Sequence, residues 1–273
     1  MTRESVDRLF VVASRELTTV ARTRAFLALA AGFAALVAAL AWSAEPTGYA
    51  PLVLDLLTPV EVLVPALALA FGYRTVLGDR ERGELDVVRT YPVSRATFVV
   101  GAYLGRAAAL LVAVVVPLFG VAALVPAVGG VGTTVVASHA AADSPVLYVR
   151  FVVLAAAFAL VLMAVAMAVS ATARSTRAGL AVAVALGLAL VVGFDAGIVA
   201  GLAGGVVGDD ALGLALGASP NSAFRGLVLS TVVGGVESSA PVADPAASLF
   251  GLAAWLVGSL GLAAVTVWSG RRR

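Results

Sequence analysis

Long apolar stretches, separated by short charged or Gly/Pro-rich segments, fill most of this 273-residue chain. A membrane-spanning helix needs about 20 mainly apolar residues, and the pattern predicts six such helices. The expected spans are 25–42, 58–77, 96–124, 144–170, 177–206 and 246–268. The fold class that follows is an all-α membrane protein in which residues 25–273 form one six-helix transmembrane domain.

The first 24 residues carry a different pattern. Apolar residues such as Leu9, Ala13 and Leu17 recur at helical spacing, while Arg8 and Arg15 lie on the opposite side. This arrangement is typical of an amphipathic helix in the membrane interface. We expect residues 1–24 to form an interfacial helix that leads directly into the first span.

Local signals predict where two of the spans begin. Thr58, Pro59 and Glu61 match a capping box with proline at the first helical position, so the second span is expected to start there. Ser94 is expected to cap the third span. Under this interpretation Glu61 has a structural role at a helix end.

Arginine placement tests the number and orientation of the spans. Clusters at 3–24, 80–95, 174–177 and 271–273 fall on one expected side, whereas the other side holds Arg150 and Arg225. Basic residues are enriched in cytoplasmic segments, so six crossings of the cell membrane with both termini cytoplasmic are predicted. The apolar stretch 211–233 would add a seventh crossing and break this agreement. It is better explained as a re-entrant or outer-surface hairpin within an outer loop at 207–245.

Composition narrows the chemistry. The chain is 61% hydrophobic and 12% charged, against roughly 25% charged residues in soluble domains, so a soluble globule is excluded. There is no cysteine, and His139 is the one histidine, which leaves no cysteine-based or histidine-rich metal site. No P-loop is present. We expect no cofactor, no metal and no catalytic set, and we attribute the arginines to membrane topology rather than nucleic-acid binding.

The loop 78–95, between the second and third spans, is the richest charged segment and is expected in the cytoplasm. Four acidic residues balance four arginines there, although topology alone would require only the arginines. Residues 84–90 can form a short helix with Leu85 and Val88 on one side, ended by Pro92. Such a helix would suit docking to a partner protein, with the apolar residues as anchors. The alternative is a solvated loop.

The segment 81–95, followed by Gly101–Ala102–Tyr103–Leu104–Gly105, resembles the E-R-G-T-L-x-x-L-x-x-x-P-V-S-R … G-K-x-L-G motif of ABC-2 type transporter permeases. Glu84 and Ala102 depart from it. The resemblance implies a coupling helix that contacts a separate ABC ATP-binding subunit, and a homodimer of the permease. The coupling residues it implies are Glu81, Arg82, Glu84, Leu85, Val88, Arg89, Tyr91, Pro92, Ser94 and Arg95.

A second element is more distantly similar to one subfamily. Residues 219–225 read Ser-Pro-Asn-Ser-Ala-Phe-Arg and resemble the N-P-x-D-A-F-R element of permeases tied to nitrous-oxide-reductase maturation, often labelled copper-transport permeases. Ser219 and Ser222 depart from that element.

Three ionisable residues fall within or beside the expected spans, where such residues are functional candidates by default. Glu61, Arg106 and Asp195 are candidates for lining a translocation path. Each also has a structural alternative, which is helix capping for Glu61, snorkelling toward the cytoplasm for Arg106, and an interfacial position for Asp195.

The function predicted from these patterns is a membrane permease subunit of an ABC-2 type transporter, with ATP hydrolysed by another chain. The alternatives are a non-transporting membrane scaffold and an intramembrane enzyme. An enzyme would need a convergent set of ionisable residues near the membrane midplane, and the sequence offers no such set.

Overall fold

The computed structural model describes residues 3–128, 144–205, 209–233 and 244–268, which fold into helices without a strand. The first half contains α1 (Arg3–Arg22), α2 (Arg24–Ala44), α3 (Tyr49–Gly72), α4 (Thr75–Glu81), α5 (Glu84–Val88), α6 (Arg95–Ala122) and α7 (Leu124–Val128). The second half contains α8 (Pro145–Thr172), α9 (Thr176–Leu188), α10 (Phe194–Ala203), α11 (Asp209–Ala218), α12 (Pro220–Val228) and α13 (Pro245–Thr266). Two π-helical segments, η1 (Ala189–Gly193) and η2 (Leu229–Val233), follow α9 and α12.

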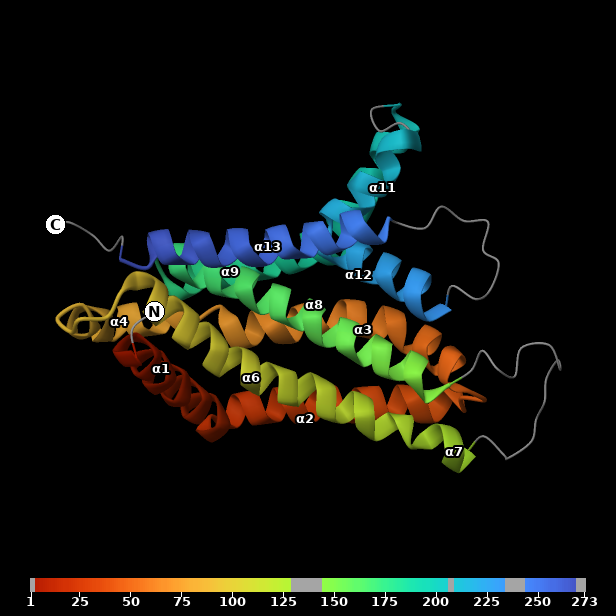
Figure 1. Cartoon of the computed structure of the whole chain (residues 1–273), viewed down its shortest axis with the longest axis horizontal. Coiled ribbons are helices and arrows are strands. Elements are labelled where there is room, and N and C mark those ends of the chain that lie inside the picture. Colours follow the sequence, from red (N-terminus) through yellow and green to blue (C-terminus); the bar gives the residue numbers. More distant parts are fainter. Residues whose placement is uncertain (1–2, 129–143, 206–208, 234–243, 269–273) are drawn as a thin grey trace.

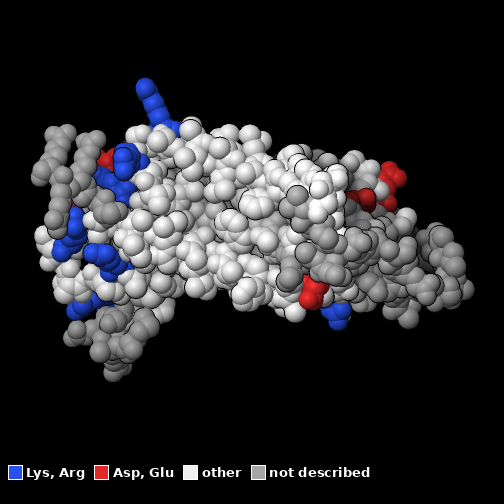
Figure 2. All heavy atoms as spheres, turned by 90° about the horizontal axis from the view of Figure 1, so that it is seen from above, with Lys and Arg blue, Asp and Glu red and all other residues white. Residues whose placement is uncertain are grey.

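Six helical stretches in the described ranges are long and apolar enough to cross a membrane, which confirms the predicted number. They are Arg24–Ala44, Tyr49–Glu81, Arg95–Ala127, Pro145–Thr172, Thr176–Ala203 and Pro245–Thr266. In Figure 1, α1 begins and α13 ends at the same end of the molecule, beside α4. Charged side chains gather toward the two ends of the visible face, arginines mainly at one, with an uncharged belt between them (Figure 2). His139 and the terminal arginines 271–273 lie outside the described residues.

The start of the second span differs from the prediction. α3 begins at Tyr49, after Gly48, and contains Pro59 and Pro65 in its interior. The pattern at Thr58 therefore does not cap a helix, and Glu61 has no capping role. The prediction was wrong because proline usually breaks a helix interior, whereas neighbouring helices in a membrane bundle hold a spanning helix together around it.

The start of the third span agrees with the prediction. The Ser94 side-chain oxygen accepts a hydrogen bond of 3.0 Å from the Thr97 backbone N–H, satisfying one of the free donors at the start of α6. The helix then continues through Pro117 to Ala122.

α3 and α8 form the centre of the bundle. α8 packs against α3, α6 and α13, and its residues from 161 to 171 are all buried. Phe158 of α8 stacks on Phe224 of α12, with ring centroids 4.7 Å apart. The hairpin formed by α11 and α12 therefore packs against the core through its second helix. Its re-entrant or surface position relative to the membrane stays a prediction.

α1 packs along α6 at two glycines. A Cβ at Gly105 would overlap the carbonyl oxygen of Ala13, and a Cβ at Gly101 would lie 2.8 Å from the Cβ of Val12. Glycines four residues apart let two helix backbones approach closely. On its outer side α1 exposes Phe10 and Leu17, as a helix in the membrane interface would, although that location stays a prediction.

We predict that Gly105→Ala weakens the docking of α1. The added methyl must displace the α1 backbone, and overpacking of this kind costs about 1–3 kcal/mol. Thermal unfolding in detergent, together with proteolysis of α1, measures the effect. The control is Gly120→Ala on the same helix, where a Cβ meets nothing within 4 Å. If both variants unfold at the same temperature, the α1–α6 contact is unimportant for stability.

Candidate functional site

The charged loop folds as two short helices joined at a glycine. α4 continues from the end of α3, and Gly83 adopts a left-handed conformation with φ of 74° that only glycine takes up readily. α5 then begins at Glu84, as predicted, and is followed by a turn at Arg89 and Thr90 and a bend at Tyr91 and Pro92 before α6. The loop is therefore an ordered unit at the arginine-rich end.

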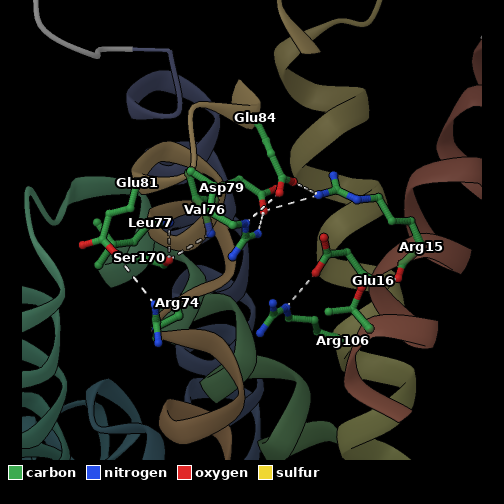
Figure 3. Close-up of polar contacts among 12 residues, drawn as sticks. Arg15, Glu16, Arg74, Val76, Leu77, Asp79, Glu81, Glu84, Arg106 and Ser170 are labelled. Atoms are coloured by element: carbon green, nitrogen blue, oxygen red, sulfur yellow. Dashed lines mark hydrogen bonds and ion pairs between the residues drawn. The ribbon is translucent and has the colours of Figure 1, made fainter. Parts of the chain in front are cut away.

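Two loop carboxylates bind α1. Arg82 donates to Asp79 at 2.5 Å and to Glu84 at 2.6 Å, while Arg15 of α1 contacts both carboxylates, lying 3.4 Å from Asp79 (Figure 3). The hydrogen bond from Arg82 lowers the pKa of Glu84, so this carboxylate is charged at neutral pH. Asp79 is 2% exposed. Two arginines thus share two acids across the contact between α1 and the loop.

The same loop is bonded to the ends of three other helices. Glu81 accepts a hydrogen bond of 2.8 Å from the backbone N–H of Thr176, at the start of α9. Arg80 donates to three carbonyl oxygens, those of Ala171 at 2.9 Å, Ala173 at 2.8 Å and Val267 at 3.4 Å. These carbonyls lie at the C-terminal ends of α8 and α13, where helices leave acceptors unsatisfied. Displacement of the loop would therefore act directly on α8, α9 and α13.

A buried hydroxyl completes this attachment. The Ser170 Oγ of α8 accepts hydrogen bonds from the backbone N–H groups of Val76 and Leu77, at 2.9 and 3.1 Å (Figure 3). Ser170 is 0% exposed, so the bonds are shielded from water. They fix α4 against the central helix of the bundle.

Leu85 and Val88 were predicted to face a partner protein, whereas in the structure both side chains pack against the protein itself. Leu85 is 5% exposed and belongs to the core, and Val88 packs against the core. The amphipathic face of this helix therefore covers the protein itself, and a coupling role for these two residues stays a prediction. Val87 and Tyr91 are 59% and 63% exposed instead.

The other predicted coupling residues of this segment flank Val87 and Tyr91 in the chain. Arg89 lies over the Trp268 ring at 5.7 Å and is 3.9 Å from Asp86. The carbonyl oxygen of Pro92 accepts a hydrogen bond from Arg8 of α1. Arg95 is exposed at the start of α6. The outer face of the loop is therefore a small apolar surface with a charged rim.

Arg106 lies below the loop, between α1 and α3. It donates to Glu16 of α1 at 2.9 Å and to the carbonyl oxygen of Phe71 at 2.5 Å, and it lies 5.7 Å from the centre of the Phe26 ring. Arg106 is 6% exposed and Glu16 is 3% exposed. This is a buried ion pair that joins α1, α3 and α6 (Figure 3).

The other two intramembrane candidates come together around Arg225 of α12. Arg225 donates to both oxygens of Glu61, at 2.8 and 2.5 Å, and to Asp195 at 3.1 Å. The Ser222 hydroxyl donates to Asp195, and the Asn221 amide donates to the backbone carbonyl of Glu61 at 2.9 Å. This charge cluster links α3, α10 and α12, and it holds two carboxylates against one guanidinium.

This convergence was not predicted from the sequence, in which Glu61 and Asp195 were separate candidates and Arg225 fell in an expected outer loop. A buried charge needs a partner, and that requirement was a signal that Glu61 and Asp195 needed a cation. The pairing was hidden because Glu61 and Arg225 lie 164 residues apart in the chain.

Comparisons with known proteins give further information. The sequence model of a protein family described as "ABC-2 family transporter protein" matches residues 10–268 of this chain. Two curated proteins named "Probable ABC transporter permease protein NosY" are similar to this chain. The protein from Stutzerimonas stutzeri is 29% identical over 126 residues, which cover 44% of this chain and 45% of that protein. The protein from Pseudomonas aeruginosa is 32% identical over 123 residues, covering 42% and 44%. The matches thus span less than half of each relative, and both names agree with the subfamily that residues 219–225 resemble.

Proposed function

This chain belongs to the ABC-2 family of transporter proteins, and on that premise we propose that it is the permease subunit of an ABC transporter. In this role it would move a substrate across the membrane while a separate ABC ATP-binding subunit hydrolyses ATP. The names of the two similar proteins, both ABC transporter permeases, support the proposal.

The observation that carries the proposal is the attachment of the loop 78–95. The loop is bonded to α1 through Arg15, to α9 through Glu81, and to α8 and α13 through Arg80. Ser170 of α8 also holds the residues of α4 that directly precede the loop. An ATP-binding subunit that pushes on the outer face of the loop would move four helices together. Rigid-body movement of packed helices is a common way to alternate access to a site. The loop thus has the connections that a coupling element requires.

The arginine-rich end would face the cytoplasm. Arg80, Arg82, Arg89 and Arg95 lie there with Arg174 and Arg177, in agreement with the enrichment of basic residues on that side. This orientation places the loop where ATP is available, and it places both ends of the described chain inside the cell. We propose a homodimer in the cell membrane, as the family resemblance implies.

The charge cluster of Glu61, Asp195 and Arg225 is the candidate for the translocation path. The Arg225 and Asp195 side chains are 43% and 28% exposed, although Glu61 is 3% exposed. Ionisable groups at membrane depth usually face a bundle interior or a water-filled cavity. We therefore propose that a passing polar substrate meets Arg225 and Asp195.

The coupling role is tested by changing the outer face of the loop. We expect Val87→Asp combined with Tyr91→Ala to weaken the affinity for the ATP-binding subunit by at least about 30-fold, so that much less of it co-purifies from native membranes. Loss of one anchor residue at the centre of an interface costs about 2 kcal/mol. Thermal stability should not change, because both side chains are exposed.

The control for this experiment is Trp42→Ala, which removes an equally exposed apolar side chain (66%) from the last turn of α2. That end of α2 lies away from α4 (Figure 1). It should leave co-purification intact. Normal co-purification of the Val87/Tyr91 variant would exclude this face as the coupling contact. Leu85→Asp is unsuitable for the test, since it would unfold the loop.

A further inference from the structure

A groove of about 390 Å³ lies between α3 and α9. Its walls are almost entirely apolar, and both helices belong to candidate membrane spans, so its open side faces the hydrocarbon region of a bilayer. Short side chains create its depth. Its lining includes Ala66 and Ala70 of α3, Tyr73 directly after α3, and Ala183, Gly187 and Leu188 of α9.

One end of this groove is basic. Arg74 follows Tyr73 directly, and Arg177 lies one helical turn before the groove residue Leu180. Within the described residues, neither Arg177 nor the neighbouring Arg174 forms an ion pair, and both are exposed. Arg174 and Arg177 can therefore bind an anion at this end of the groove.

Three contacts bring these arginines to the same end. The Cβ position of Gly179 lies 4.0 Å from the carbonyl oxygen of Tyr73, so the first turns of α9 pack against the end of α3. Glu81 accepts from Thr176 at 2.8 Å and lies 3.7 Å from Arg74 (Figure 3). Arg74 remains 49% exposed beside it. The apolar slot thus ends in a basic rim at the arginine-rich end of the molecule.

We propose that this groove binds one acyl chain of an anionic phospholipid from the leaflet at the arginine-rich end. Arg74, Arg174 and Arg177 hold its phosphate, and Tyr73 lies at the level of the headgroup, where aromatic residues favour the interface. Basic pockets between membrane helices bind anionic headgroups through such charges. A helix from a second copy could fill the apolar slot, but it would leave the arginines without an anion. The lipid site does not require the chain to be a permease, so either conclusion can fail alone.

The headgroup contact is tested with purified protein in nanodiscs of equal parts phosphatidylglycerol and phosphatidylcholine. After extraction into mild detergent, the retained lipid is quantified by mass spectrometry. The wild type is expected to retain phosphatidylglycerol in preference. Arg74→Gln combined with Arg177→Gln should lower its retention about five-fold for each arginine removed. The control pair Arg22→Gln with Arg95→Gln neutralises two exposed arginines elsewhere and should retain it normally. Equal retention of the two lipids, or an equal loss in the control pair, would overturn the proposal.

The acyl-chain contact is tested by filling the groove. Ala66→Phe is expected to release the retained lipid, whereas Leu54→Phe, at an exposed position of the same helix outside the groove, is not. Leu188→Trp fills the groove from the α9 side and replaces Ala66→Phe if that variant does not fold. Unchanged lipid retention in a folded groove variant rejects the site. If a groove variant shifts the monomer–dimer ratio but keeps its lipid, the groove is a contact between two copies of the chain. This result also rejects the lipid site.

Discussion

Arg106→Ala is expected to destabilise the protein by about 3–5 kcal/mol, because removing one partner of a buried ion pair leaves the other charge uncompensated. The stranded group is Glu16, which is 3% exposed. The carbonyl oxygen of Phe71 also loses its 2.5 Å hydrogen bond. Chemical denaturation in detergent micelles measures the loss, and proteolysis within α1 should increase.

Two further variants show whether the destabilisation by Arg106→Ala comes from the unpaired charge of Glu16. Arg95→Ala removes an exposed arginine at the start of the same helix and should change stability little. Glu16→Leu with Arg106→Met replaces the pair by apolar groups, which is often neutral or stabilising. This double variant should recover most of the stability lost in Arg106→Ala. A double variant as unstable as Arg106→Ala would mean that packing of the arginine, rather than charge pairing, determines the effect.

Arg225→Ala is expected to have the second largest effect, about 3 kcal/mol. Glu61 is 3% exposed and would lose both of its ion-pair bonds. The value lies at the lower end for a buried pair because the arginine itself is 43% exposed. Thermal unfolding measures the stability loss, and the ATPase rate of the proposed complex with an ATP-binding subunit tests whether the cluster also matters for the proposed function.

Arg225→Lys separates charge from geometry. Lysine keeps the positive charge but cannot reproduce the planar, two-oxygen contact with Glu61, so an intermediate stability is expected. The control is Arg150→Ala, because Arg150 is an exposed arginine that donates at 3.2 Å to the carbonyl oxygen of Thr231. A stable, active Arg225→Ala protein would remove the charge cluster from the list of functional sites.

The number of spans was predictable because each needs its own run of apolar residues, and hydropathy reports that run directly. The start of α3 was not predictable from local signals. A threonine, a proline and a glutamate at 58, 59 and 61 look the same at a helix start and inside a spanning helix. Only the packing of other helices around the segment decides between the two.

In the candidate site, too, some features were predictable from the sequence and others were not. Amphipathic spacing identified the short helix at Glu84, but it could not specify whether Leu85 faces the core or a partner, since either surface buries an apolar side chain. Pairings such as Arg106 with Glu16 depend on residues 90 positions apart. The sequence therefore identified the charged residues but not the residues with which they form ion pairs. The four-residue spacing of Gly101 and Gly105 does favour a close helix contact, but it does not identify α1 as the partner helix.

The ion pair between Glu16 and Arg106 has a consequence for how the protein is made. Glu16 leaves the ribosome 90 residues before Arg106, which at 5–20 residues per second corresponds to a delay of about 5–20 s. During that time α1 has neither its cation nor the α6 glycines against which it packs. Docking of α1 against α6 therefore follows the synthesis of the third span, and until then the apolar side of this amphipathic helix needs another surface, such as the lipid, to cover it.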